Sequence, residues 1–209
     1  KVCMTLSKTT RSCSGSKDKM ISRLYLLFIL IIYSWHCAGI NIQKMARDDP
    51  AALIALEDSL SERGLSPAII SALVAAHNTL GLAALEAEDY KKGIDHFSKA
   101  VGLSELDTLS RYNLLIAEGH LLYKRGNKDG LWEAIQNYHK AAQLKPDLGN
   151  PHYYIGQSYH KLGDSDFDLI LESYEMALTL NLSSHLRDKT EAAHARVSKR
   201  DTLLKDFWK

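Results

Sequence analysis

The chain has 209 residues, 45% of them hydrophobic and 24% charged, so it can bury a core in one or two domains. The net charge of +1 hides an asymmetry: residues 1–44 carry seven basic side chains and one acidic one, and the remainder carries 19 basic and 24 acidic ones. This mildly acidic body argues against a nucleic-acid partner, because nucleic-acid affinity depends on neutralising phosphates.

Two N-terminal segments precede the body. Residues 1–19 are polar, rich in Ser, Thr and Lys, and predicted to form a disordered basic tail. Residues 20–44 hold the most hydrophobic run, Leu24–Ile32, which matches the core of a signal peptide. Stretched over residues 24–42, the run could just span a bilayer, which needs about 20 apolar residues. We therefore expect a signal peptide or membrane anchor. The protein would then be exported or membrane-anchored, in a periplasm and cell envelope or an equivalent lumen.

The start of translation leaves a second location open. A start at Met20 would keep a compact signal, whereas a start at Met45 would remove the hydrophobic segment and leave a cytoplasmic protein. Cys37, after the run, raises a lipid anchor as another form of attachment, although Trp35 and His36 are bulky for such a signal. All three cysteines lie in residues 1–37, so the body has no cysteine-based disulfide, zinc site or nucleophile.

The body, residues 48–209, is predicted to be helical throughout. A first helix is expected from Asp49 to about Arg63, because an Asp cap followed by Pro favours a helix start and Gly64 favours its end. Ser66 and Pro67 start a second helix in the same way, and it should reach about Ala87.

The strongest feature of the body is self-similarity. Three glycines, Gly81, Gly119 and Gly156, recur 37–38 residues apart in similar helical contexts. Each is followed 16–19 residues later by an aromatic residue and, three positions after that, by an alanine. These are Phe97 and Ala100, Tyr138 and Ala141, and Tyr174 and Ala177. Small residues on paired helices allow close approach, and the aromatic rings fill the space between the helices. A single helix pair of this kind cannot bury its apolar face alone, so successive pairs stack on one another.

This pattern resembles the tetratricopeptide-repeat (TPR) family, with repeats at about residues 74–107, 112–148 and 149–182. The third repeat matches best, whereas the second has Glu118 and Leu122 at unusual positions, and none has the usual early Trp. The resemblance implies an all-α fold, a TPR-like right-handed superhelical solenoid of antiparallel helix pairs with N- and C-terminal capping helices. The C-terminal capping helix is expected over residues 184–207.

The resemblance also implies a concave face, lined by the first helix of each pair, that binds a peptide or helix of another protein. The residues expected to line this groove are neutral, aromatic or amide-bearing: Asn78, Leu82, Asn113, Ile116, His120, Tyr123, Asn150, Tyr153, Tyr154, Gln157 and His160. TPR co-chaperones instead grip a chaperone carboxylate with Lys, Asn and Arg side chains. The matching positions here (Asn78, Leu82, Ala117, Asn150 and Tyr154) lack the cations, which argues against that subtype.

The expected function is therefore a non-enzymatic protein–protein interaction module, a scaffold or adaptor. No catalytic motif, metal-ligand spacing or cofactor motif is evident, so no catalytic residues, metal or cofactor are expected. One alternative is an accessory component of a solute-transport complex with a ligand pocket, for which an enclosed cavity near Ile116, Tyr123 and Tyr153 would speak. The expected partners are another protein, the membrane through residues 24–42 if these are uncleaved, and no nucleic acid. Homo-oligomerisation is left open.

Overall fold

The computed structural model describes residues 41–163 and 167–207. The chain divides after Asn41, and the part from Ile42 to Lys209 is the helical domain discussed below. The predicted basic tail and nearly all of the predicted signal or anchor segment therefore lie outside the described residues.

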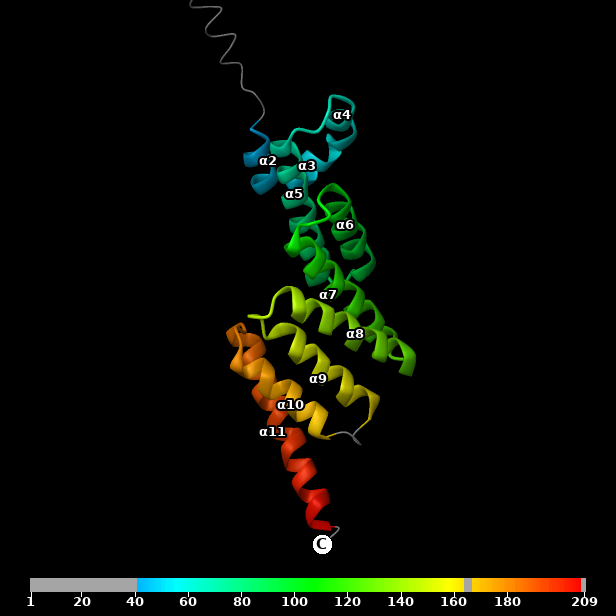
Figure 1. Ribbon diagram of the computed structural model, residues 1–209, viewed down its shortest axis with the longest axis vertical. Helices are drawn as coiled ribbons and strands as arrows, with labels where there is room; N and C mark the ends of the chain where they lie inside the picture. The colour runs from blue at the N-terminus through cyan, green and yellow to red at the C-terminus, as the bar shows by residue number, and fades with distance from the viewer. Residues whose placement is uncertain (1–40, 164–166, 208–209) are drawn as a thin grey trace, which may run out of the picture. The chain divides into compact units, whose positions relative to one another are not determined.

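The domain is built from helices that follow one another closely (Figure 1). The described residues form α2 (Ile42–Asp48), α3 (Pro50–Ala55), α4 (Glu57–Glu62), α5 (Pro67–Glu86), α6 (Tyr90–Leu103), α7 (Thr108–Arg125), α8 (Lys128–Leu144), α9 (Asn150–Leu162), α10 (Phe167–Thr179) and α11 (Ser184–Phe207). The pairs α5/α6, α7/α8 and α9/α10 pack within themselves, and each pair packs against the next element along the chain. The fold is an all-α, TPR-like solenoid.

Short polar residues start the helices, because a side-chain oxygen there accepts a backbone N–H that the helix leaves unpaired. Asp49 accepts from the N–H of Ala52 at 3.0 Å, with Pro50 in the first turn. Ser66 and Asp107 cap α5 and α7 in the same way. At the other end of α7, Gly126 has φ 71°, a left-handed conformation that glycine adopts at low cost.

Two boundaries differ from the expectation. The helix expected over residues 49–63 is divided at Leu56, whose N–H bonds to the carbonyl of Leu53 in a tighter turn. The helical domain also begins earlier than residue 48, because α2 starts at Ile42. Ile42 and Met45 pack against a core cluster that includes Leu53 and Leu73. Ile42, the last residue of the possible membrane-spanning stretch, thus contributes to the domain core.

The three repeats share one packing device, a glycine on the first helix that faces an aromatic ring on the second. A Cβ atom added at Gly81 would lie 2.5 Å from Cε1 of Phe97, and one added at Gly156 would lie 2.6 Å from Cε1 of Tyr174. A Cβ atom at Gly119 would overlap the ring of Tyr138 in the same way. These rings are fully buried, so the glycines set the separation of the paired helices.

Backbone hydrogen bonds also join two connections that are distant in sequence. The N–H of Gly149 donates to the carbonyl of Asn181 at 2.8 Å, and the N–H of Asn181 donates to the carbonyl of Asp147 at 3.0 Å. The link from α8 to α9 is thereby held against the link from α10 to α11. This fixes the start of α9, which carries several of the predicted groove residues.

Helix α5 is the described helix that is long and apolar enough to cross a membrane by length and composition. It packs against α2, α3, α6 and α7, and its buried residues include the polar His77 and Asn78. Those contacts make it the central helix of the N-terminal half of the domain.

The glycine–ring contact predicts that alanine, which normally stabilises a helix relative to glycine, is destabilising at these positions. Gly119→Ala should lower the free energy of unfolding by about 2 kcal/mol, because overlap with the buried Tyr138 ring outweighs the helix propensity that alanine adds. Gly102→Ala on α6 is the matched control: nothing lies within 4 Å of its added Cβ, and it should gain about 0.5 kcal/mol. Urea titrations measure both, and an unchanged or raised stability of Gly119→Ala would contradict the packing account.

Candidate functional site

The described domain has a groove of about 670 Å³, which we call the tyrosine groove. Helices α5, α7 and α9, the first helices of the three pairs, supply most of its lining, and α6, α8 and α11 add single residues. The lining residues are Leu82, Leu85, Glu86, Glu88, Tyr90, Tyr112, Asn113, Ile116, His120, Tyr123, Tyr138, Asn150, Tyr153, Tyr154, Gln157 and Lys189.

Most of the residues expected in the groove lie together there. They are Leu82, Asn113, Ile116, His120, Tyr123, Asn150, Tyr153, Tyr154 and Gln157. His160 does not line this groove but lies beside an adjoining pocket of about 380 Å³, which Gln157 also lines. Asn78 lines neither pocket and is only 6% exposed.

Asn78 belongs to a buried chain of hydrogen bonds beneath the groove. Its amide donates to Ser110 Oγ at 2.7 Å, and its carbonyl oxygen accepts from Asn113 Nδ2 at 3.0 Å. Ser110 Oγ in turn donates to Asp107 at 2.5 Å. Because buried amides must find partners, Asn78 joins α5 to α7 and orients Asn113, which lines the groove.

Sequence reasoning missed several lining residues. The sequence predicts that Tyr138 packs between helices, and its ring does pack there, but its hydroxyl also reaches His120 Nδ1 at 2.8 Å. Tyr90 lies at the start of α6 and Tyr112 one position before Asn113, so neither follows the spacing used for the first helices. Lys189 comes from α11, the helix expected only as a C-terminal cap. No pattern in the sequence of α11 indicates that this lysine approaches the groove.

Aromatic rings form a continuous surface centred on His120. Its ring lies 4.5 Å from that of Tyr154 in an edge-on arrangement and 5.5 Å from that of Tyr90, measured between centroids. Tyr154 continues the series to Tyr153 at 5.3 Å, and Tyr153 lies 6.2 Å from Tyr174. Such ring pairs add stabilisation beyond the burial of their area and hold the rings in fixed orientations.

Burial keeps this surface uncharged. It lowers the pKa of His120 to about 4, because a charged imidazole would lose solvation there. It raises the pKa of Tyr154 to about 12 and raises the pKa of Tyr112 and Tyr138 further. At neutral pH the phenols are therefore protonated, and the imidazole is neutral.

Charged groups lie at the margins of the groove. Glu86 is the last residue of α5, Glu88 follows that helix, and Lys189 comes from α11. Lys124 lies 3.5 Å from Glu88 and over the ring of Tyr90, with Nζ 5.1 Å from the centroid. Lys161 lies over Tyr123 and donates to its backbone carbonyl at 2.8 Å.

A second polar cluster lies apart from the groove, among α4, α5 and α6. His77 is fully buried and lies 3.2 Å from Glu57 and 3.1 Å from His96. Burial is the main cause that lowers the pKa of both histidines. Within residues 41–163 and 167–207, no group of three His, Cys, Asp or Glu side chains is placed to hold a metal ion.

Comparison with known proteins is consistent with this architecture. A family model described as TPR repeat matches residues 119–163, which cover part of α7, all of α8 and α9. The chain is also 33% identical over 86 residues to the protein named heat shock protein sti1 homolog from Schizosaccharomyces pombe. That alignment covers 41% of this chain and 13% of the relative, so the chain spans a small part of that protein's length.

The buried imidazole predicts a pH-dependent stability. The folded-state pKa of His120 lies below its ordinary 6.5, so the unfolded chain takes up the proton first, and stability is lost as pH falls from 6.5 towards 4. Between pH 7.5 and pH 5, His120 should account for about 2 kcal/mol of the loss. His120→Gln removes that share, so the variant should lose less stability than the wild type over this range in urea titrations.

His185→Gln makes the same change at an exposed position and serves as control. If His120→Gln and His185→Gln both show the wild-type difference between pH 7.5 and pH 5, the assignment to His120 is wrong.

Proposed function

Because this chain belongs to the tetratricopeptide-repeat family, we propose that it is a non-enzymatic interaction module that binds a segment of another protein in the tyrosine groove. The observation that carries the proposal is the meeting of rings and amides from three successive helix pairs along one groove. Tyrosine gives rigid, amphipathic contact area at low entropic cost, which is typical of the residues that dominate protein interfaces.

The side chains that could contact a partner are partly exposed rather than buried. Tyr123, Tyr153 and Tyr154 keep part of their surface open, as do Asn150 and Gln157. The rings beneath them are packed, so the groove is formed before a partner arrives. Preorganisation of this kind lowers the entropic cost of binding.

The partner proposed is not the carboxylate of a chaperone. Of the positions where such a clamp needs polar or cationic side chains, Ala117 is fully buried and Asn78 is engaged beneath the groove. Leu82 and Tyr154 offer no positive charge. The S. pombe relative is named a heat shock protein, but the clamp positions of this chain hold no cation that could bind the two carboxylate oxygens.

A solute-binding role in a transport complex is the second candidate. The volume of about 670 Å³ is within the range of small-molecule sites, and Ile116, Tyr123 and Tyr153 are among the lining residues. The groove draws its lining from elements spread between α5 and α11, however, and this extent favours an elongated occupant over a compact one.

We further propose that the protein is exported or membrane-tethered through residues 24–42, with a cytoplasmic adaptor starting at Met45 as the alternative. The packing of α2 supports the first version. Ile42 and Met45 both contact the core cluster of the N-terminal half, so a start at Met45 would remove the first turn of a helix that the domain uses. Processing near residues 37–40 would leave α2 whole.

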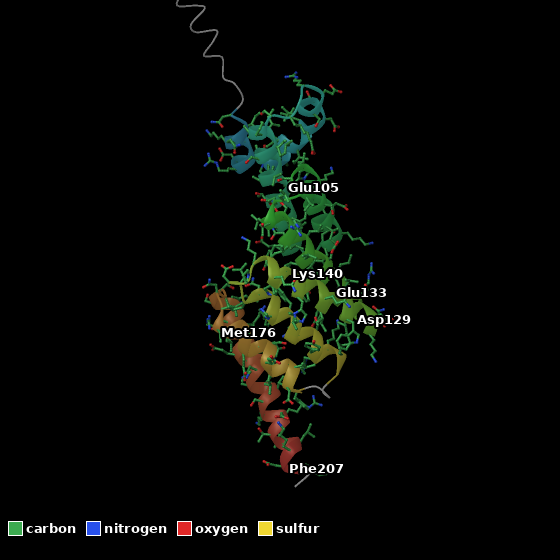
Figure 2. All side chains as sticks on the ribbon, in the orientation of Figure 1. Glu105, Asp129, Glu133, Lys140, Met176 and Phe207 are labelled. Atoms are coloured by element: carbon green, nitrogen blue, oxygen red, sulfur yellow. The ribbon has the colours of Figure 1, made fainter. Side chains whose placement is uncertain are left out.

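The binding proposal is tested by selecting peptides from a displayed library on the full chain and measuring their affinity for variants. Tyr153→Ala and Asn150→Ala should each weaken the selected peptides at least tenfold, because each removes a side chain of the groove. Met176→Ala is the control: this side chain, on α10 and labelled in Figure 2, is 44% exposed and is not among the residues that line the groove. If Tyr153→Ala and Asn150→Ala bind the selected peptides as tightly as Met176→Ala and the wild type do, the binding site lies elsewhere.

The location is tested by fractionation of cells that express the full chain, with intact-mass measurement of the product. We expect a product that begins between residues 37 and 40, or an uncleaved product in the membrane fraction. A soluble product that begins at Met45 would contradict export and favour the cytoplasmic adaptor.

A further inference from the structure

We infer that the tyrosine groove takes a proline-rich segment in the polyproline II conformation, uncharged at its centre, with a basic residue towards α5 and an acidic residue towards α11. This inference rests on the proposed function and names the chemistry of the partner. It follows from the rings, the hydrogen-bond donors and the charges of the groove.

The rings supply faces and edges rather than deep apolar holes. His120 contacts Tyr90, Tyr138 and Tyr154, and all three contacts are tilted or edge-on. Tilted rings leave shallow ridges between them, onto which the flat pyrrolidine rings of proline can pack. Aromatic-lined grooves that recognise proline-rich segments use this fit, and they gain because the polyproline II conformation already has low entropy.

Three hydroxyl groups of the groove, those of Tyr112, Tyr153 and Tyr154, are donors without a protein acceptor. Within the described residues, no hydrogen bond involves any of these three hydroxyls, and no buried side-chain polar atom lacks a partner. These hydroxyls therefore reach solvent in the open groove. Burial of the rings raises the pKa of all three tyrosines, which keeps the hydroxyls protonated and able to donate.

A donor-rich groove favours an acceptor-rich occupant. A polyproline II segment has no internal hydrogen bonds, so its carbonyls are open to donors, and each proline removes an N–H that would need an acceptor. A helical segment has paired its own carbonyls and would leave the tyrosine hydroxyls unused. Strand addition needs an exposed sheet edge, and the described residues contain only one isolated β-bridge, between Leu148 and Asn181.

The two margins of the groove carry charges of opposite sign. Nothing in the centre of the groove is ionised at neutral pH, so a charged central residue would lose solvation without a partner. Glu86, at the α5 end, and Lys189, from α11, are exposed and have no ion pair within the described part of the chain. A basic residue near Glu86 and an acidic one near Lys189 would complement them.

The test uses the full chain and three fluorescent peptides of equal length in anisotropy titrations. The first has lysine, an uncharged proline-rich centre and glutamate, in that order. The second replaces lysine and glutamate with glutamine, and the third replaces the prolines with alanine. We expect the first peptide to bind at least tenfold tighter than the alanine peptide and about threefold tighter than the glutamine-ended one, because exposed ion pairs contribute little.

Two variants connect the result to named groups. Tyr154→Phe keeps the ring and removes one donor, and it should weaken the proline peptide about fivefold while leaving the alanine peptide unchanged. The double variant Glu86→Gln with Lys189→Gln should bind the charged and the glutamine-ended peptide equally tightly. Thermal unfolding of each variant confirms that the domain remains folded.

The outcomes separate this inference from the proposed function. If library-selected peptides bind and depend on Tyr153, but the alanine peptide or an amphipathic helix binds as well as the proline peptide, the inference is wrong and the interaction module stands. If no peptide from any source binds in the groove, both are wrong.

Discussion

The contact between a glycine and an aromatic ring within each helix pair is the constraint on which the rest of this domain depends. Gly81, Gly119 and Gly156 have no side chain where Phe97, Tyr138 and Tyr174 lie, and the three rings are buried. Without that space the paired helices would separate, and the next pair would meet a different surface. Because the interior is closely packed, a shift at one pair would pass to its neighbours.

One of these rings, that of Tyr138, also lines the tyrosine groove. Two of the three rings are tyrosines, and their hydroxyls extend past the glycine towards the first helices. Tyr138 reaches His120 at 2.8 Å, and Tyr174 accepts from Gln157 Nε2 at 3.2 Å. In the first repeat the ring is Phe97, which has no hydroxyl to offer. The polar character of the groove is therefore concentrated in the second and third repeats.

Burial also determines the electrostatic character of the groove. An imidazole and several phenols lie close together, and desolvation holds each in its neutral form. The charged side chains lie at the margins, where water screens them. A groove of this kind discriminates by shape and hydrogen bonding in its centre and by charge only at its ends. A carboxylate clamp, by contrast, draws its specificity from charged side chains at its centre.

Several features could be predicted from the sequence because they depend on local or periodic information. The helix starts at Asp49 and Ser66, the recurrence of Gly81, Gly119 and Gly156, and the helical repeat pattern all come from short-range rules. The TPR-like fold followed from them and is confirmed. Most predicted groove residues also lie together, because one face of each first helix turns towards the same side when similar pairs stack.

What the tertiary structure alone decided involves residues distant in the chain. Asn78 lies beneath the groove because Ser110 and Asn113 meet its amide there, a contact across 32 and 35 positions that no periodicity reports. Tyr138 serves packing and groove together, and Lys189 arrives from the capping helix. The start of α2 at Ile42 depends on the apolar surface that α3 and α5 present to it. Periodicity determines which side of a helix is apolar, but the neighbours that cover it are determined only when the helices pack.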